Sequence, residues 1–263
     1  MGEGFVELTR ERIELLKVPL DIVPHDKLEE IIFDLLKDGG GGGKNIVLLS
    51  VWDLLRARHN VEYREYVRGA ALVIPISKSL VRGARFLTGK VPQRYMPFNF
   101  IIAALTILEK RERTIYLLGG KTAALAKTEK HLRATFPKLR IVGRFPGRFK
   151  KHTEETLIQV IRKSAPSLLL VNEGVSGGER WIARNSVSLN VGLRLWVSDI
   201  FDVFAKRKKR PSKVVFDNGL EWVGFCFQSP LRFFRIFRYL YYNILLVVYK
   251  LRPKQAPLSA QTP

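Results

Sequence analysis

The chain of 263 residues contains little cysteine and little histidine. Its single cysteine, Cys226, excludes a disulfide within the chain and is typical of a reducing compartment. The four histidines are scattered without the spacing of metal ligands, so we expect no metal site. The first residues, MGEG, provide neither a positive n-region nor an apolar h-region. The sequence therefore predicts no secretory signal and a cytoplasmic protein.

Long apolar runs are also absent. Residues 240–249 are apolar apart from Asn243, and this stretch is far shorter than the ~20 residues that a membrane-spanning helix needs. With 46% hydrophobic residues, the chain can still bury a sizeable core, as one large domain or as a domain with an appendage.

Acidic residues are scarce: the chain has 24 Asp and Glu but 45 Lys and Arg, which gives a net charge of +21. Residues 206–254 hold twelve Lys or Arg and two acids, a net charge of 12 − 2 = +10. This region opens with Lys206, Arg207, Lys208, Lys209 and Arg210. Such charge predicts a polyanionic partner, either an anionic membrane surface or a nucleic acid. No nucleic-acid motif accompanies it, so nucleic acid is the less favoured partner.

The apolar spacing of residues 233–251 predicts an amphipathic helix. Arg232, Arg235 and Arg238 fall opposite the apolar face, with Tyr239 and Tyr242 near them. A basic face, an apolar face and tyrosines are typical of a helix that lies in a membrane interface. The alternative is a terminal helix that packs its apolar face on the core, and the neighbouring basic run favours the membrane. The apolar face comprises Phe233, Ile236, Phe237, Leu240, Ile244, Val247, Val248 and Leu251.

Short apolar runs alternate with helical patterns along the rest of the chain. Strands are predicted over residues 45–50, 72–76, 114–118, 139–143, 167–171 and 193–197. Helices are predicted over residues 99–111, 122–136, 153–164 and 178–187. This alternation predicts an α/β fold with a mostly parallel, Rossmann-like sheet, helices on both faces and a C-terminal helical appendage. Such folds bind ligands beyond the carboxyl ends of the strands.

Composition divides the chain into an α/β domain (1–205), a basic, aromatic membrane appendage (206–252) and a disordered tail (253–263). Five glycines at residues 39–43 predict a flexible connector between an N-terminal unit, residues 5–37, and the first main strand.

Two loops could hold phosphate. Gly119, Gly120 and Lys121 follow a strand and precede a helix, which allows a close approach of phosphate to the backbone. Spacing alone favours a tight turn, and a Walker A motif is excluded because its first glycine would be Ile115. The second loop carries two arginines and two aromatic rings for a nucleotide, although an ordinary basic loop is the favoured interpretation. It runs from Gly143 through Arg144, Phe145, Gly147 and Arg148 to Phe149.

Carboxylates with catalytic potential follow the last two strands. Glu179 lies in the first turn of a helix, where the helix dipole favours a carboxylate in any case. Asp199 and Asp202 follow the final strand, and Asp199 is expected to cap a helix over residues 200–206. No Ser/His/Asp or Cys/His arrangement is visible.

A series of motifs from Arg12 to Leu240 resembles the WecG/TagA/CpsF family of bacterial glycosyltransferases. The segment RIELLKVPL (12–20) looks like the N-terminal strand of that family, and YLLGGK (116–121) matches its FLLGGK signature. Further similarity lies in PKLRIVG (137–143) before Gly147 and Phe149, ERWIARN (179–185), FD (201–202) and LEW (220–222) with Pro230 and Arg232.

The resemblance implies transfer of an N-acetylhexosamine from a UDP-sugar to a polyprenyl-diphosphate-linked sugar at the inner face of the cytoplasmic membrane. It implies inversion, no required metal or other cofactor, and a C-terminal appendage that contacts the membrane and helps close the active site. A homo-oligomer is left open. Nucleotide-sugar binding would fall to Gly119, Gly120, Lys121, Gly143, Gly147 and Arg148, and an acceptor or structural role to Arg94 and Asn99.

The chain departs from the family at its chemical positions. Ile76 and Ser77 replace the aspartate and glycine of the family's ADG motif, whose aspartate is the proposed base. Gly178 replaces a glutamine, and Asn99 replaces an acid. Gly224 and Ser229 replace an arginine and a glutamate in the appendage. Glu179 or Asp202 would then have to supply the base. The alternative is an inactive relative that binds nucleotide-sugar, lipid or a partner enzyme at the membrane.

Overall fold

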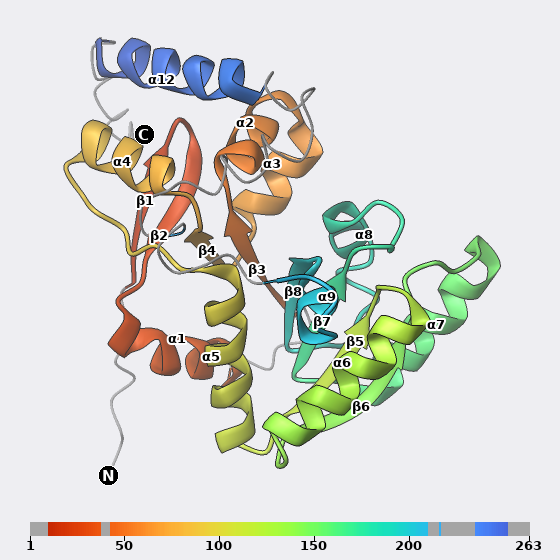
Figure 1. Ribbon diagram of the computed structural model, residues 1–263. Helices are drawn as coiled ribbons and strands as arrows, with labels where there is room; N and C mark the ends of the chain where they lie inside the picture. The colour runs from red at the N-terminus through yellow and green to blue at the C-terminus, as the bar shows by residue number, and fades with distance from the viewer. Residues whose placement is uncertain (1–9, 38–42, 210–215, 217–234, 252–263) are drawn as a thin grey trace, which may run out of the picture.

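The computed structural model describes residues 10–37, 43–209, 216 and 235–251 (Figure 1). A six-stranded sheet, in which every neighbouring pair is parallel, has the order β4-β3-β8-β7-β5-β6. The α/β prediction is therefore confirmed, with strand ends within two residues of those expected. The strands are β3 (Lys44–Leu49), β4 (Leu72–Pro75), β5 (Thr114–Leu118), β6 (Arg140–Phe145), β7 (Leu168–Asn172) and β8 (Leu193–Ser198).

Both faces of the sheet are covered, which explains the continuous apolar runs. Alternate residues of β7 enter different cores, because successive side chains of a strand point to opposite faces. Leu169 and Val171 belong to one buried cluster, whereas Leu168 and Leu170 belong to the other. Every residue of β7 is buried as a result.

Of the helices in the described ranges, the four before residue 97 were not predicted individually, and the others begin and end within about two residues of the predicted bounds, except that the helix at residues 179–184 is shorter. The helices are α1 (Leu28–Lys37), α2 (Val51–His59), α3 (Val61–Arg68), α4 (Lys78–Thr88), α5 (Pro97–Lys110), α6 (Thr122–Thr135), α7 (Lys151–Ser164), α8 (Glu179–Arg184), α9 (Ile200–Phe204) and α12 (Arg235–Leu251), with a 3-10 turn at His25–Lys27.

The N-terminal segment forms a hairpin rather than the single strand that residues 12–20 suggested. Strands β1 (Glu11–Leu15) and β2 (Val18–Ile22) pair antiparallel. Leu16 and Lys17 connect them with φ values of 51° and 66°. Positive φ at both central residues belongs to a tight hairpin turn that glycine or asparagine usually marks. Neither residue is present here, so no sequence signal marks the turn.

Helix α12 lies against α4 and α2 at one end of the molecule (Figure 1). The second half of the chain thereby returns to helices that follow the first two strands of the sheet. No helix within the described ranges is long and apolar enough to cross a bilayer.

Candidate functional site

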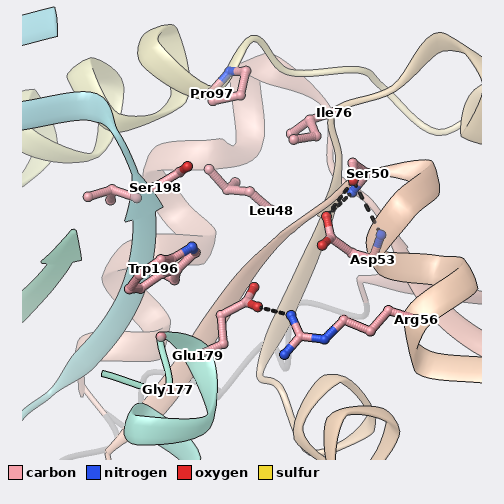
Figure 2. A pocket seen from close by; sticks show the side chains of 12 residues that line it. Leu48, Ser50, Asp53, Arg56, Ile76, Pro97, Gly177, Glu179, Trp196 and Ser198 are labelled. Atoms are coloured by element: carbon pink, nitrogen blue, oxygen red, sulfur yellow. Dashed lines mark hydrogen bonds and ion pairs between the residues drawn. The ribbon is translucent and has the colours of Figure 1, made fainter. Parts of the chain in front are cut away.

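A pocket of about 410 Å³ opens where strands β3, β4 and β8 end (Figure 2). Parallel strands present their carboxyl ends at one edge of the sheet, where α/β proteins bind their ligands. The loop before α8 closes the pocket from the side. Its lining comprises Leu48, Ser50, Asp53, Arg56, Ile76, Pro97, Gly177, Gly178, Glu179, Trp196, Val197 and Ser198.

Glu179, which the sequence proposed as a candidate base, points into this pocket and is only 9% exposed. One carboxylate oxygen accepts a hydrogen bond from Arg56 Nη1 at 2.8 Å, and the other accepts from the Tyr63 hydroxyl at 3.0 Å. Burial, followed by the charge of Asp53, raises the pKa of Glu179 from 4.5 to about 7, against the opposing effects of Arg56 and Tyr63. A carboxyl group with this pKa can accept a proton near neutral pH.

A second carboxylate, Asp53, enters the same pocket from the first turn of α2. It forms a capping box with Ser50: the carboxylate accepts the Ser50 amide at 2.9 Å, and Ser50 Oγ accepts the Asp53 amide at 3.3 Å. Burial raises the pKa of Asp53, although the bonds from Ser50 oppose that shift. Sequence reasoning missed Asp53, and the available signal was the S-x-x-D pattern directly after an apolar strand.

The pocket suits a sugar better than a phosphate. When both carboxyl groups are ionised, Asp53 and Glu179 outweigh the single cation of Arg56 and repel an anionic group. Carboxylates accept hydrogen bonds from hydroxyl groups, and the indole of Trp196 adds an apolar wall beside Glu179 (Figure 2). Gly178 borders the same indole with a φ of 56°, a backbone conformation that favours glycine.

Ile76 also lines the pocket, at the position that the resemblance assigns to the family's catalytic aspartate. Arg94 holds this part of the wall, because its Nε donates to the Ile76 carbonyl oxygen at 2.9 Å. Arg94 Nη1 donates to the Phe216 carbonyl oxygen at 2.6 Å, and the guanidinium lies 3.6 Å from the Phe216 ring. Arg94 therefore links the pocket wall to Phe216. Asn99 is exposed on α5 and does not line the pocket.

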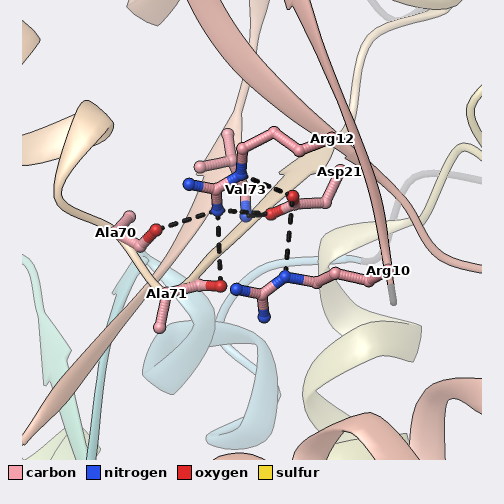
Figure 3. Close-up of polar contacts among 6 residues, drawn as sticks. All are labelled: Arg10, Arg12, Asp21, Ala70, Ala71 and Val73. Atoms are coloured by element: carbon pink, nitrogen blue, oxygen red, sulfur yellow. Dashed lines mark hydrogen bonds and ion pairs between the residues drawn. The ribbon is translucent and has the colours of Figure 1, made fainter. Parts of the chain in front are cut away.

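The strand that leads to Ile76 is held by a buried charge cluster (Figure 3). Asp21 is fully buried and accepts the Val73 amide of β4 at 2.6 Å. Arg12 donates to both carboxylate oxygens of Asp21, at 2.7 and 2.9 Å, and to the Ala70 carbonyl oxygen. Arg10 approaches the same carboxylate at 3.8 Å. The cluster thus ties the N-terminal hairpin to an edge strand of the sheet.

The predicted nucleotide-sugar residues lie outside the pocket lining, in the loops after β5 and β6, except for Gly143, which lies within β6. The Gly119 amide donates to the Phe145 carbonyl at 2.9 Å, and the Gly120 amide donates to the Glu173 carbonyl at 2.6 Å. Gly147 in turn donates to Gly120 at 3.0 Å. These amides therefore hold the three loops together.

Close backbone packing also accounts for the glycines themselves. A Cβ at Gly119 would lie 2.5 Å from the Asn172 carbonyl oxygen, and one at Gly147 would lie 2.7 Å from the Gly174 backbone. A Cβ at Gly143 would lie 2.4 Å from the Tyr116 ring. Lys121 and Arg148 are exposed beside these loops and remain accessible to an anionic ligand.

Asp199 does not cap α9 with its side chain, so that expectation was wrong. Its carboxylate pairs with Lys208 Nζ at 2.7 Å, and Asn172 Oδ1 accepts the Phe201 amide of α9 instead, at 3.1 Å. Asp202 lies 3.6 Å from Arg207 Nε and does not line the pocket. Of the two candidate bases, the structure brings only Glu179 into the pocket.

The basic run is exposed from Lys206 to Lys209, with Arg207 and Lys208 paired as described. Arg210 and Arg232 lie outside the described residues, as do the LEW motif, Gly224, Ser229 and the 253–263 tail. Arg235 opens α12, and Arg238 lies on its exposed surface with its guanidinium 5.6 Å from the Trp52 ring.

Helix α12 packs through its tyrosine side and leaves its apolar face outside. Tyr242 is 1% exposed, and its hydroxyl donates to the Ser79 carbonyl oxygen at 3.0 Å. Leu246 is also buried in the core, so the helix does pack on the domain, but the side chains of the predicted apolar face do not make this contact. Those exposed are Phe237, Leu240, Ile244, Val247, Val248 and Leu251.

The buried Glu179 should make stability depend on pH. Because its pKa is raised from 4.5 to about 7, the folded protein retains a proton that the unfolded chain releases between these values. The stabilisation is therefore complete below pH 4.5 and is lost as the pH rises through about 7. In urea denaturation, wild type should lose stability relative to Glu179→Gln across this window. If the difference in unfolding free energy between the two proteins stayed constant between pH 4.5 and 7, the raised pKa would be contradicted.

The structure is thus that of an α/β protein with an acidic pocket at the carboxyl edge of a parallel sheet, the edge where such folds generally bind ligands. A model of the glycosyl transferase WecG/TagA/CpsF family matches residues 13–257. The match spans nearly the whole chain, so the protein belongs to this family, and the resemblance seen in the motifs is confirmed. Membership implies a nucleotide-sugar donor and an acceptor in general terms.

Proposed function

We propose that this protein transfers an N-acetylhexosamine from a UDP-sugar to a polyprenyl-diphosphate-linked acceptor in the synthesis of a cell-envelope polysaccharide. The observation that carries the proposal is the buried Glu179, whose pKa of about 7 places a proton acceptor in the pocket of a glycosyltransferase-family fold. The position of the family's aspartate is filled by Ile76, which cannot take a proton.

In the proposed step, a hydroxyl oxygen of the acceptor sugar attacks the anomeric carbon of the donor. The bond between that carbon and the β-phosphate oxygen breaks, and UDP leaves with the electron pair. Glu179 takes the hydroxyl proton as the new glycosidic bond forms. Arg56 and Tyr63 orient the carboxylate through their hydrogen bonds, while the charge of Asp53 favours uptake of the proton.

The charge distribution supports different binding places for the sugar and for the diphosphate of the donor. The acidic pocket with Trp196 accommodates the sugar ring. Lys121 and Arg148, exposed at the neighbouring strand ends, provide cations for the diphosphate. No metal is required in this proposal, because side-chain cations neutralise the leaving group.

The presence of Ile76 in the pocket wall favours one alternative, a relative that binds nucleotide-sugar without transferring it. The two functions are distinguished by combining calorimetry with an assay of UDP release. UDP-N-acetylglucosamine and UDP-N-acetylmannosamine, each with a lipid-linked acceptor, should give both binding and release of UDP. Binding without release would establish the inactive alternative, and the absence of binding would exclude both.

We also propose that α12 attaches the protein peripherally to the inner face of the cytoplasmic membrane. Support comes from the exposed apolar face of the helix and from the basic run at residues 206–209. An anionic membrane surface is thus the proposed partner, and nucleic acid remains disfavoured.

Two substitutions on this face, Leu240→Ser with Ile244→Ser, should lower cosedimentation with anionic liposomes by about 10-fold or more, because they remove apolar area that enters the interface. The matched control, Val160→Ser with Val187→Ser, removes exposed apolar side chains far along the chain from α12 and should change binding little. Equal sedimentation of both variants would contradict the membrane role of α12.

A further inference from the structure

Helix α4 is built tightly against α12. A Cβ on Gly83 would lie 2.1 Å from the Tyr242 hydroxyl, so only glycine allows this approach. The same hydroxyl donates to the Ser79 carbonyl oxygen, and Lys250 Nζ donates to the Phe86 carbonyl oxygen at 3.0 Å. The two helices are therefore joined near both ends of α4, and α4 is fixed relative to α12 (Figure 1).

The side of α4 that faces away from the core is cationic and partly apolar. Arg82, Arg85 and Phe86 follow the i, i+3, i+4 spacing of one helix face, and all three are exposed. Phe86 is 46% exposed and lies 5.5 Å from Lys250 Nζ, so this face adjoins the C-terminal part of α12.

All charged residues of α4 and α12 are basic. Neither α4 (KSLVRGARFLT) nor α12 (RIFRYLYYNILLVVYKL) contains an acidic residue. Within the described part of the chain, neither Arg82 nor Arg85 forms an ion pair with a carboxylate. A fixed cationic face continuous with an exposed apolar helix is complementary to an anionic bilayer.

We propose that α4 is a second lipid-contacting element, in which Arg82 and Arg85 bind phosphate groups of anionic lipids while Phe86 enters the interface beside α12. The proposal rests on the proposed membrane attachment by α12 and extends it to a separate helix. Guanidinium groups suit this role because they bind phosphate oxygens through two parallel hydrogen bonds. The adjoining α4 and α12 faces would set the orientation of the protein on the membrane, since two helices fix a plane that one helix cannot.

The test uses the full chain and vesicles of phosphatidylglycerol and phosphatidylcholine, compared with vesicles of phosphatidylcholine alone. Arg82→Gln with Arg85→Gln should weaken binding to the anionic vesicles by about 30-fold, from the contribution of two surface arginines. The variant and wild type should bind neutral vesicles equally. The matched control is Arg113→Gln with Arg140→Gln, which removes the same charge from exposed positions at the amino ends of β5 and β6 and should change binding less than twofold.

Phe86→Ser is a second test that leaves the net charge unchanged, and this substitution should weaken binding to both kinds of vesicle. Unfolding midpoints equal to that of wild type would show that each variant is folded. If the α4 variants bind like the control while the α12 variant loses binding, the role of α4 is overturned and attachment by α12 stands. If the α4 and α12 variants all bind like wild type, the proposed membrane attachment fails as well.

Discussion

Glu179→Gln should lower the rate of sugar transfer by roughly 10²–10⁴-fold, the contribution of a general base. Glutamine keeps the size of the side chain, and its amide oxygen can accept the hydrogen bond of Arg56 while its amide nitrogen donates to the Tyr63 hydroxyl oxygen, but it cannot take a proton. The measurement is UDP release from a UDP-N-acetylhexosamine with a lipid-linked acceptor. UDP affinity, determined by calorimetry, should remain close to that of wild type, because the diphosphate is proposed to bind elsewhere.

Asp202→Asn distinguishes the two carboxylates that the sequence had proposed. Asp202 pairs with Arg207 outside the pocket, so its replacement should leave transfer within a few-fold of wild type. Loss of transfer in the Asp202 variant, with activity retained in the Glu179 variant, would reverse the assignment of the base.

Asp21→Ala should lower the free energy of unfolding by about 3 kcal/mol, the lower end of the range for breaking a buried pair. The lower end applies because Arg10 and Arg12 are partly exposed to solvent, which screens their charges. The substitution also leaves the buried Val73 amide without its acceptor. Urea denaturation followed by circular dichroism measures the change.

The matched control for Asp21 is Glu29→Ala. Glu29 forms an ion pair of the same length with Lys110, at 2.7 Å, but both side chains are about half exposed. Its loss should cost at most about 1 kcal/mol, as for surface pairs in general. Equal destabilisation by the two substitutions would show that the buried cluster contributes no more than a surface pair.

The sheet was predictable because its strands are nearly continuous apolar runs, such as LLLV in β7, that only burial on both faces explains. The N-terminal hairpin was missed because Leu16 and Lys17 adopt positive φ without glycine or asparagine to mark the turn. Positive φ can be predicted from local sequence only where glycine or asparagine occupies the turn.

The pocket was predictable only in part. Glu179 was proposed from its motif, but its partners lie 116 and 123 residues away in the chain, at Tyr63 and Arg56. No local pattern connects residues at such separations, so their pairing required the tertiary structure. Asp199 shows the reverse error: its position suggested a cap, while the fold supplies that hydrogen bond from Asn172.

The central claim is that Glu179 acts as the base of a glycosyltransferase at this pocket. The most direct measurement is the pH dependence of UDP release by the wild-type protein, with a UDP-N-acetylhexosamine and a polyprenyl-diphosphate-linked acceptor. The rate should rise about tenfold per pH unit on the acid side and reach a plateau above the Glu179 pKa of about 7. A rate that does not change between pH 5 and 8, or no release of UDP at any pH, would contradict it.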